Sequence, residues 1–122
     1  MIQKKLDVLI DKLTSSTESG KVEWERTSSK NEYQTKIGEN AVSVGLYDPN
    51  DLANLVTVNF GVVNKKYCYL NVYNSQGVIV DSEEIFIGDQ NYGKLNCLFQ
   101  MAQRNYYKAD ETLDDILKKL EQ

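Results

Sequence analysis

Hydrophobic and polar residues alternate along the middle of the chain, between Leu55 and Val80, with the period of two that is typical of strands with one buried face. The apolar positions are Val56, Val58, Phe60 and Val62 in one run and Cys68, Leu70 and Val72 in the next. A three-residue loop at 64–66 would pair Val62 with Cys68, Phe60 with Leu70 and Val58 with Val72, whereas a two-residue loop would mix tyrosines into that face. We therefore expect a hairpin with one apolar face.

The same alternation predicts strands on both sides of this hairpin. A loop at 75–77, with Gly77 in the left-handed conformation, would place Val80 opposite Val72. A short strand at 21–26 is expected first, and 83–87 either extends the sheet or forms its edge. Between them, 32–37 and 41–47 form a predicted hairpin whose loop, Glu39-Asn40, would set Ile37 opposite Val42, Thr35 opposite Val44 and Tyr33 opposite Leu46.

Apolar residues recur at helical spacing in three further segments. The first carries Ile2, Leu6, Leu9, Ile10 and Leu13 and should end before Gly20. The second follows Tyr92, Leu95, Phe99, Ala102 and Tyr106, and the third starts at Asp110 and follows Leu113, Ile116, Leu117 and Leu120. The predicted fold is a single α+β domain over 1–122, an antiparallel meander of about six strands with an N-terminal helix and two C-terminal helices packed on one face.

The net charge of the chain limits the classes of partner that it is expected to bind. Its 14 basic and 18 acidic residues give a formal net charge of −4, and the basic residues are scattered rather than gathered in the stripe that a nucleic-acid backbone requires. Direct nucleic-acid binding is therefore not expected. The N-terminal run has charges every few residues, so we expect neither a signal peptide nor a membrane span. Together with Cys68 and Cys97 at positions predicted to be buried and apolar, this predicts a reduced, cytoplasmic protein.

The chain has no histidine, which removes the usual general base and the commonest metal ligand. Both cysteines lie at positions predicted to be apolar, where a thiol is normally inert. Paired carboxylates such as Glu83-Glu84 point in different directions on a strand or helix. Two segments, 48–51 and 89–93, resemble parts of calcium loops without the full ligand set, and turn and helix-cap roles explain both. We expect no catalytic residue, no metal site and no cofactor, and hence no enzyme.

Tyrosine is unusually frequent in this chain. Three of the eight tyrosines stand on the face of the central strands that the register turns away from the helices, beside polar side chains. Such a face offers the contact area and hydrogen-bonding groups of an interface, although tyrosines also suit any half-exposed sheet surface. Trp24 could join this face or fill the core under the first helix, and we expect the core. The candidate binding residues are Tyr67, Tyr69, Tyr73, Asn59, Asn71 and Thr57.

The opening of the chain carries a leucine helix, with Leu6, Leu9 and Leu13, followed by Ser19-Gly20-Lys21-Val22-Glu23-Trp24. It resembles small uncharacterised bacterial and prophage proteins that begin with a leucine helix, a Ser/Thr-x-Gly turn and a tryptophan-bearing strand. Their C-terminal helix is also similar to the segment 98–120. These motifs are structural, so the resemblance implies a mobile-element setting and no activity.

Two functions from different classes fit these features. The first is a non-enzymatic interaction protein that a phage or prophage uses to block or modulate a host protein, such as a defence protein. The second is a small-ligand binder, for instance a nucleotide-signal sponge, with the ligand held at the tyrosine-rich face or at a subunit interface. An exposed row of tyrosines usually marks a contact site, so the face would be covered in a homodimer or offered to a partner or ligand.

Overall fold

One antiparallel sheet and three helices form the structure, a computed structural model that describes residues 3–49 and 65–121. The strands pair in the order β1-β2-β3-β4-β5, each antiparallel to its neighbour. The predicted α+β class and antiparallel meander are confirmed, with five strands in the described part of the chain. The elements are α1 (Lys4–Glu18), β1 (Glu25–Arg26), β2 (Glu32–Ile37), β3 (Asn40–Tyr47), β4 (Tyr67–Tyr73), β5 (Ile79–Phe86), α3 (Tyr92–Tyr106) and α4 (Ala109–Leu120).

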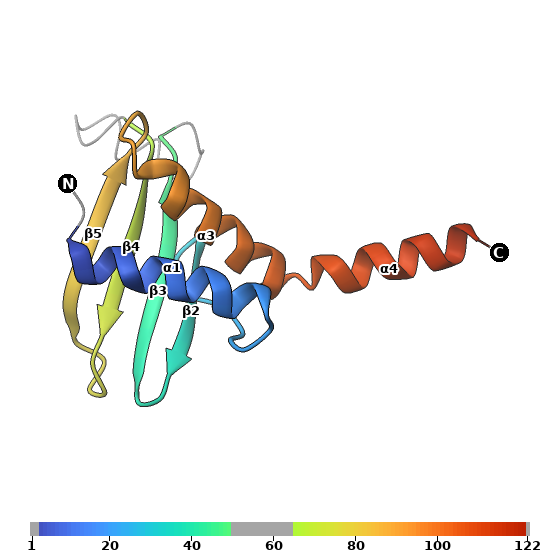
Figure 1. Ribbon diagram of the computed structural model, residues 1–122, viewed down its shortest axis with the longest axis horizontal. Coiled ribbons are helices and arrows are strands. Elements are labelled where there is room, and N and C mark those ends of the chain that lie inside the picture. The colour runs from blue at the N-terminus through green and yellow to red at the C-terminus, as the bar shows by residue number, and fades with distance from the viewer. Residues whose placement is uncertain (1–2, 50–64, 122) are drawn as a thin grey trace.

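The core lies between one face of the sheet and the helices α1 and α3, which cover that face (Figure 1). Each helix buries most of the apolar stripe that its sequence spacing predicts, whereas Tyr106, the last residue predicted for the stripe of α3, is exposed. The buried residues are Leu6, Ile10, Leu13, Leu95, Leu98, Phe99 and Ala102 from the helices, and Tyr33, Val42, Val44, Cys68, Leu70 and Ile85 from the strands.

The last helix does not pack on the sheet as predicted. α4 follows α3 directly but projects away from the body of the molecule (Figure 1). Lys108, between the two helices, has a φ of 55°, in the left-handed region, which ends α3 and redirects the chain. Because α1 and α3 already bury the apolar side chains of the inner face, a third helix there would have little left to cover.

The β2–β3 hairpin has the predicted faces but a different register. Ile37 pairs with Asn40, so the two-residue turn is Gly38-Glu39 rather than Glu39-Asn40. Gly38 has a φ of 64°, the left-handed conformation that favours glycine in such turns. A shift by two residues leaves every side chain on its own face. The predicted pairs are therefore wrong by two positions, and the observed ones include Tyr33 with Val44 and Thr35 with Val42.

β4 lies between β3 and β5, which changes its predicted partners. The predicted strand from 56 to 62 lies outside the described residues. On the other side, Val72 pairs with Asp81 and Tyr73 with Ile79, so Val80 is the extra residue of a bulge and does not face Val72 as expected. Gly77 has the predicted left-handed φ, 78°. The observed partners on β3 are Leu46 for Cys68, Val44 for Leu70 and Val42 for Val72.

The single tryptophan lies in the core, as expected, and joins three segments. Trp24 is only 3% exposed. Its indole Nε1 donates to Thr17 Oγ1 of α1 over 3.0 Å, and its backbone N donates to Asn105 Oδ1 of α3 over 2.8 Å. The backbone N–H of Trp24 bonds to this side chain of α3 rather than to a neighbouring strand, and the predicted strand at 21–26 is reduced to β1, Glu25–Arg26.

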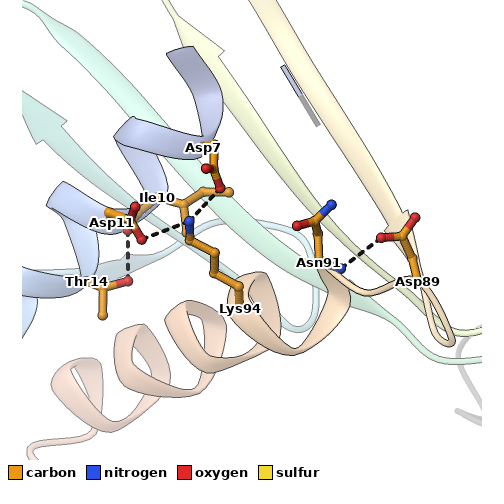
Figure 2. A network of polar contacts seen from close by, with 7 residues as sticks. All are labelled: Asp7, Ile10, Asp11, Thr14, Asp89, Asn91 and Lys94. Atoms are coloured by element: carbon orange, nitrogen blue, oxygen red, sulfur yellow. Dashed lines mark hydrogen bonds and ion pairs between the residues drawn. The ribbon is translucent and has the colours of Figure 1, made fainter. Parts of the chain in front are cut away.

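An ion-pair network ties α3 to α1. Lys94 Nζ lies 2.5 Å from Asp7 Oδ1 and 2.8 Å from Asp11 Oδ1, and Figure 2 shows its side chain reaching between the two carboxylates. The aspartates are four residues apart on α1 and therefore share one face of that helix. Hydrogen bonds to Asp11 and Asp7 raise the pKa of the Lys94 ammonium group.

Replacing Lys94 by glutamine should lower the free energy of unfolding by less than about 1 kcal/mol, because a partly exposed ion pair is screened by solvent. The loss should shrink further at high salt. Urea denaturation at low and high salt measures both effects. Lys12→Gln, on the exposed side of α1, serves as the control, and an equal loss in both variants would argue against a specific contribution from the network.

Candidate functional site

The candidate site lies on the face of the sheet opposite α1 and α3, which we call the outer face. Cys68 and Leu70 are buried against the helices, so the alternate residues of β4 point to the outer face. These are four of the six predicted binding residues, Tyr67, Tyr69, Asn71 and Tyr73. The other two, Thr57 and Asn59, lie outside the described residues.

An aromatic row crosses the outer face near one end of the sheet. Tyr67 pairs with Tyr47 of β3 on one side and with Phe86 of β5 on the other. The rings of Tyr47 and Tyr67 stack at a centroid distance of 5.1 Å and an interplanar angle of 20°. Phe86 and Tyr69 lie 5.0 and 6.2 Å from Tyr67, in tilted orientations. The row thus presents a continuous aromatic surface over three strands.

Tyr69 lies across a glycine. A Cβ atom built on Gly45, its partner on β3, would lie 2.1 Å from Tyr69 Cζ, so the ring occupies the space that a side chain at position 45 would fill. Beyond Gly45 the ring reaches Glu32 of β2. Burial, and then the neighbouring Glu32 carboxylate, raise the pKa of the Tyr69 hydroxyl. The hydroxyl therefore stays protonated at neutral pH and can donate a hydrogen bond.

Polar side chains fill the outer face next to Tyr69. Glu32 accepts a hydrogen bond from Thr27 Oγ1 at 2.5 Å and a longer one from Ser43 Oγ at 3.5 Å. Ser43 Oγ also lies 3.2 Å from the Tyr73 hydroxyl and accepts from Asn71 Nδ2 at 3.5 Å. These contacts satisfy the buried Ser43 and hold Asn71 and Tyr73 in fixed positions. Tyr73, one of the predicted binding residues, therefore belongs to this polar network.

A hollow of about 530 Å³ opens on the outer face. Three predicted residues, Tyr67, Tyr69 and Asn71, line it. Ser82 and Glu84 of β5 face them, and neither is among the predicted binding residues. Period-two alternation along β5, with Ser82, Glu84 and Phe86 on one side, is the signal that could have found them. The remaining lining residues are Ser29, Lys30, Asn31, Leu46 and Tyr47.

The hollow combines an aromatic wall with charged groups. Burial raises the pKa of the Tyr67 hydroxyl, and the nearby Glu84 carboxylate raises it further. Lys30 and Glu84, both exposed, provide one charge of each sign among the lining residues. This arrangement can stack on a flat or apolar group and can exchange hydrogen bonds with polar groups beside it. Among the described residues, no group of three or more cysteine, aspartate or glutamate side chains could hold a metal ion.

Both thiols lie away from this hollow. Cys68 is buried on the inner face, and burial raises the pKa of its thiol to about 11. Cys97 is exposed on α3, contrary to the prediction that both cysteines are buried. It stands two residues from the buried Leu95, which places its side chain on the opposite side of the helix.

In the native protein, Cys97 should react with a chromogenic disulfide reagent within the mixing time, whereas Cys68 should react only when the protein unfolds. The reason is that the thiolate is the nucleophile and a buried thiol is neither ionised nor accessible. Thiol counting should give one fast group in buffer and two in denaturant, since both cysteines are free. Equal fast reaction of both thiols would contradict the buried position of Cys68.

Comparisons with known protein families, curated proteins and solved structures find no match to the chain. In the described part of the chain, every helix is too short or too polar to cross a membrane.

Proposed function

We propose that the chain is a non-enzymatic interaction protein that binds a partner protein with its outer face. The observation that carries this proposal is the hollow with its aromatic wall, on the side of the sheet that α1 and α3 leave open. Tyrosines offer large contact area with few rotatable bonds and a hydrogen-bonding tip. A host protein blocked or modulated in this way would match the setting that the sequence resemblance implies.

The side chains around the hollow specify the chemistry of the partner. An aromatic or aliphatic side chain of the partner would rest against Tyr67 and Tyr69, as anchors in interface pockets do. A lysine or arginine beside it would face Glu84, which is exposed at the rim. The net charge of −4 also favours a basic partner surface.

A small ligand is the second candidate. The volume of about 530 Å³ falls within the range of sites for small molecules, roughly 300–1,000 Å³. A planar base could stack on Tyr67, with Asn71 and Glu84 as hydrogen-bonding groups at its edge. Thermal denaturation in the presence of nucleotides separates the two candidates: a ligand at a hundred times its Kd should stabilise the fold by about 2.7 kcal/mol, whereas a protein-binding module should melt unchanged.

Replacing Tyr67 by alanine should weaken partner binding by about 2 kcal/mol or more, roughly 30-fold, because a central interface tyrosine contributes on that scale. Immobilised wild-type chain recovers the partner, and titration of the purified partner then gives the affinity of each variant. Tyr107→Ala, at a tyrosine exposed at the end of α3, is the matched control and should bind normally.

A second variant separates loss of binding from loss of fold. Glu84→Lys changes only an exposed side chain, so its melting temperature should stay close to that of the wild type. Its affinity for a basic partner should nevertheless fall, since like charges then meet at the rim. Unchanged binding in both Tyr67→Ala and Glu84→Lys would refute the proposed surface.

A further inference from the structure

The projecting helix α4 carries an apolar stripe that nothing in the described part of the chain covers. Four residues at helical spacing form it, and they are between 48% and 76% exposed. No residue of α4 is buried in the structure as described. The stripe consists of Leu113, Ile116, Leu117 and Leu120.

An uncovered helix of this length is not stable by itself. α4 has 12 residues, and isolated helices shorter than about 12–15 residues are marginal in water because most helical stability comes from packing an apolar face. An ion pair between Lys119 Nζ and Asp115 Oδ2, 3.1 Å apart, adds only a few tenths of a kcal/mol. The helix therefore needs a surface to cover its stripe.

Charge is segregated along α4. Its first turn carries Asp110 and Glu111, its middle carries Asp114 and Asp115, and its last turn carries Lys118 and Lys119. Two such helices side by side in the same direction would set the acidic first turns against each other and the lysines against each other. In opposite directions, Asp110 and Glu111 of each helix meet Lys118 and Lys119 of the other, while Asp114 and Asp115 of both copies lie near the middle, and the helix dipoles are also opposed favourably.

We propose that α4 is a dimerisation arm that packs antiparallel against α4 of a second copy of this chain. The two stripes then cover each other about a twofold axis, an isologous contact. Position 120 of one copy would lie near position 109 of the other. The tyrosine-rich outer face takes no part in this dimer and stays open in both copies.

The surroundings of the helix base agree with this arrangement. A hollow of about 420 Å³ lies where α4 leaves the body, between the ends of α1 and α3. Four carboxylates and two cations line it, so its charge is opposite to that of the arriving lysines of the partner helix. The charged lining residues are Glu18, Glu23, Asp110 and Glu111 with Arg104 and Lys108.

A membrane surface suits the stripe less well. Helices that lie on membranes carry lysine and arginine on their polar face, because the lipid surface is anionic. α4 carries four acidic residues against two lysines between positions 109 and 120. Its polar face would be repelled, whereas a second copy supplies both signs of charge in the right places.

Sedimentation equilibrium over a concentration series tests the proposal with two matched variants. The wild-type chain should pass from monomer to dimer as its concentration rises, and Thr112→Gln, off the stripe, should do the same. Leu117→Gln, on the stripe, should remain monomeric with an unchanged sheet by near-ultraviolet circular dichroism. A wild type that stays monomeric at millimolar concentration, or a Leu117→Gln variant that still dimerises, would overturn the proposal.

Charge exchange tests the antiparallel direction. Either Asp110→Lys with Glu111→Lys, or Lys118→Glu with Lys119→Glu, should weaken the dimer at least tenfold by placing like charges opposite each other. All four substitutions together should restore the dimer, since the positively charged first turn of each helix then meets the negatively charged last turn of the other. In a parallel dimer, like charges would face each other in every one of these variants. A dimer of the fourfold variant that is no more stable than the dimers of the two double variants would therefore overturn the antiparallel pairing.

Discussion

Replacing Trp24 by alanine should lower the free energy of unfolding by about 3 to 5 kcal/mol, the range for removing a large buried aromatic side chain. Trp24 is almost fully buried and is the contact through which the chain between α1 and β1 is fixed to both covering helices. Its loss leaves a cavity and also leaves Thr17 Oγ1 without its indole donor. Urea denaturation followed by far-ultraviolet circular dichroism measures the effect without relying on tryptophan fluorescence.

A conservative variant, Trp24→Phe, separates the effect of lost side-chain volume on stability from the effect of the lost hydrogen bond. Trp24→Phe keeps most of the apolar contact but removes the indole N–H, while the Thr17 hydroxyl still donates to Leu13 O. It should therefore cost less than Trp24→Ala, with about 0.5 to 1.5 kcal/mol of the loss coming from the missing hydrogen bond. A loss below about 1 kcal/mol in Trp24→Ala would be too small for a buried aromatic side chain. It would show that Trp24 is not held between α1 and α3.

Replacing Gly45 by alanine should cost about 1 to 3 kcal/mol, because an added methyl group in a filled space forces neighbouring side chains to move. The new Cβ would lie 2.1 Å from Tyr69 Cζ, so the ring must swing away from Glu32. Combining Gly45→Ala with Tyr69→Ala should remove the clash. The double variant should then be more stable than the sum of the single losses by about 0.5 to 3 kcal/mol.

Gly93→Ala provides the matched control. A Cβ at Gly93, in the first turn of α3, meets nothing within 4 Å. Alanine is also favoured over glycine in helices by about 0.5 to 1 kcal/mol, so this variant should be neutral or slightly stabilised. If chemical denaturation found Gly45→Ala equally harmless, the ring of Tyr69 would not lie across position 45.

The faces of the sheet could be predicted from the sequence, whereas the pairing of its residues could not. Alternation assigned Tyr33, Val44 and Leu70 to the core because a period of two depends only on position along the strand. The alternation does not fix the position of the turn, because two-residue turns at 38–39 and at 39–40 leave the same residues on the inner face. The left-handed φ of Gly38 decides between them, as the bulge at Val80 decides the register of β5.

The candidate site was predictable in part for the same reason. Tyr67, Tyr69 and Asn71 follow from the alternation of β4 alone. The alternation of β5 likewise puts Ser82 and Glu84 on one face, but which strand lies beside them depends on cross-strand pairing. The loop at 29–31 completes the hollow through the direction of the chain, which no local pattern contains. The buried position predicted for Cys97 was wrong although the stripe of α3 contained the signal against it: Cys97 stands two residues from Leu95, and residues two apart on a helix point in different directions.

The most direct test of the outer face is NMR of the tyrosine rings while the recovered partner, or a stabilising nucleotide, is added to the isotope-labelled chain. The ring signals of Tyr47, Tyr67 and Tyr69 should shift on binding. Those of Tyr33, Tyr106 and Tyr107, which contact one another at the end of α3, should stay unchanged. Shifts confined to Tyr33, Tyr106 and Tyr107 would place the binding surface on the helical side and contradict the proposed function.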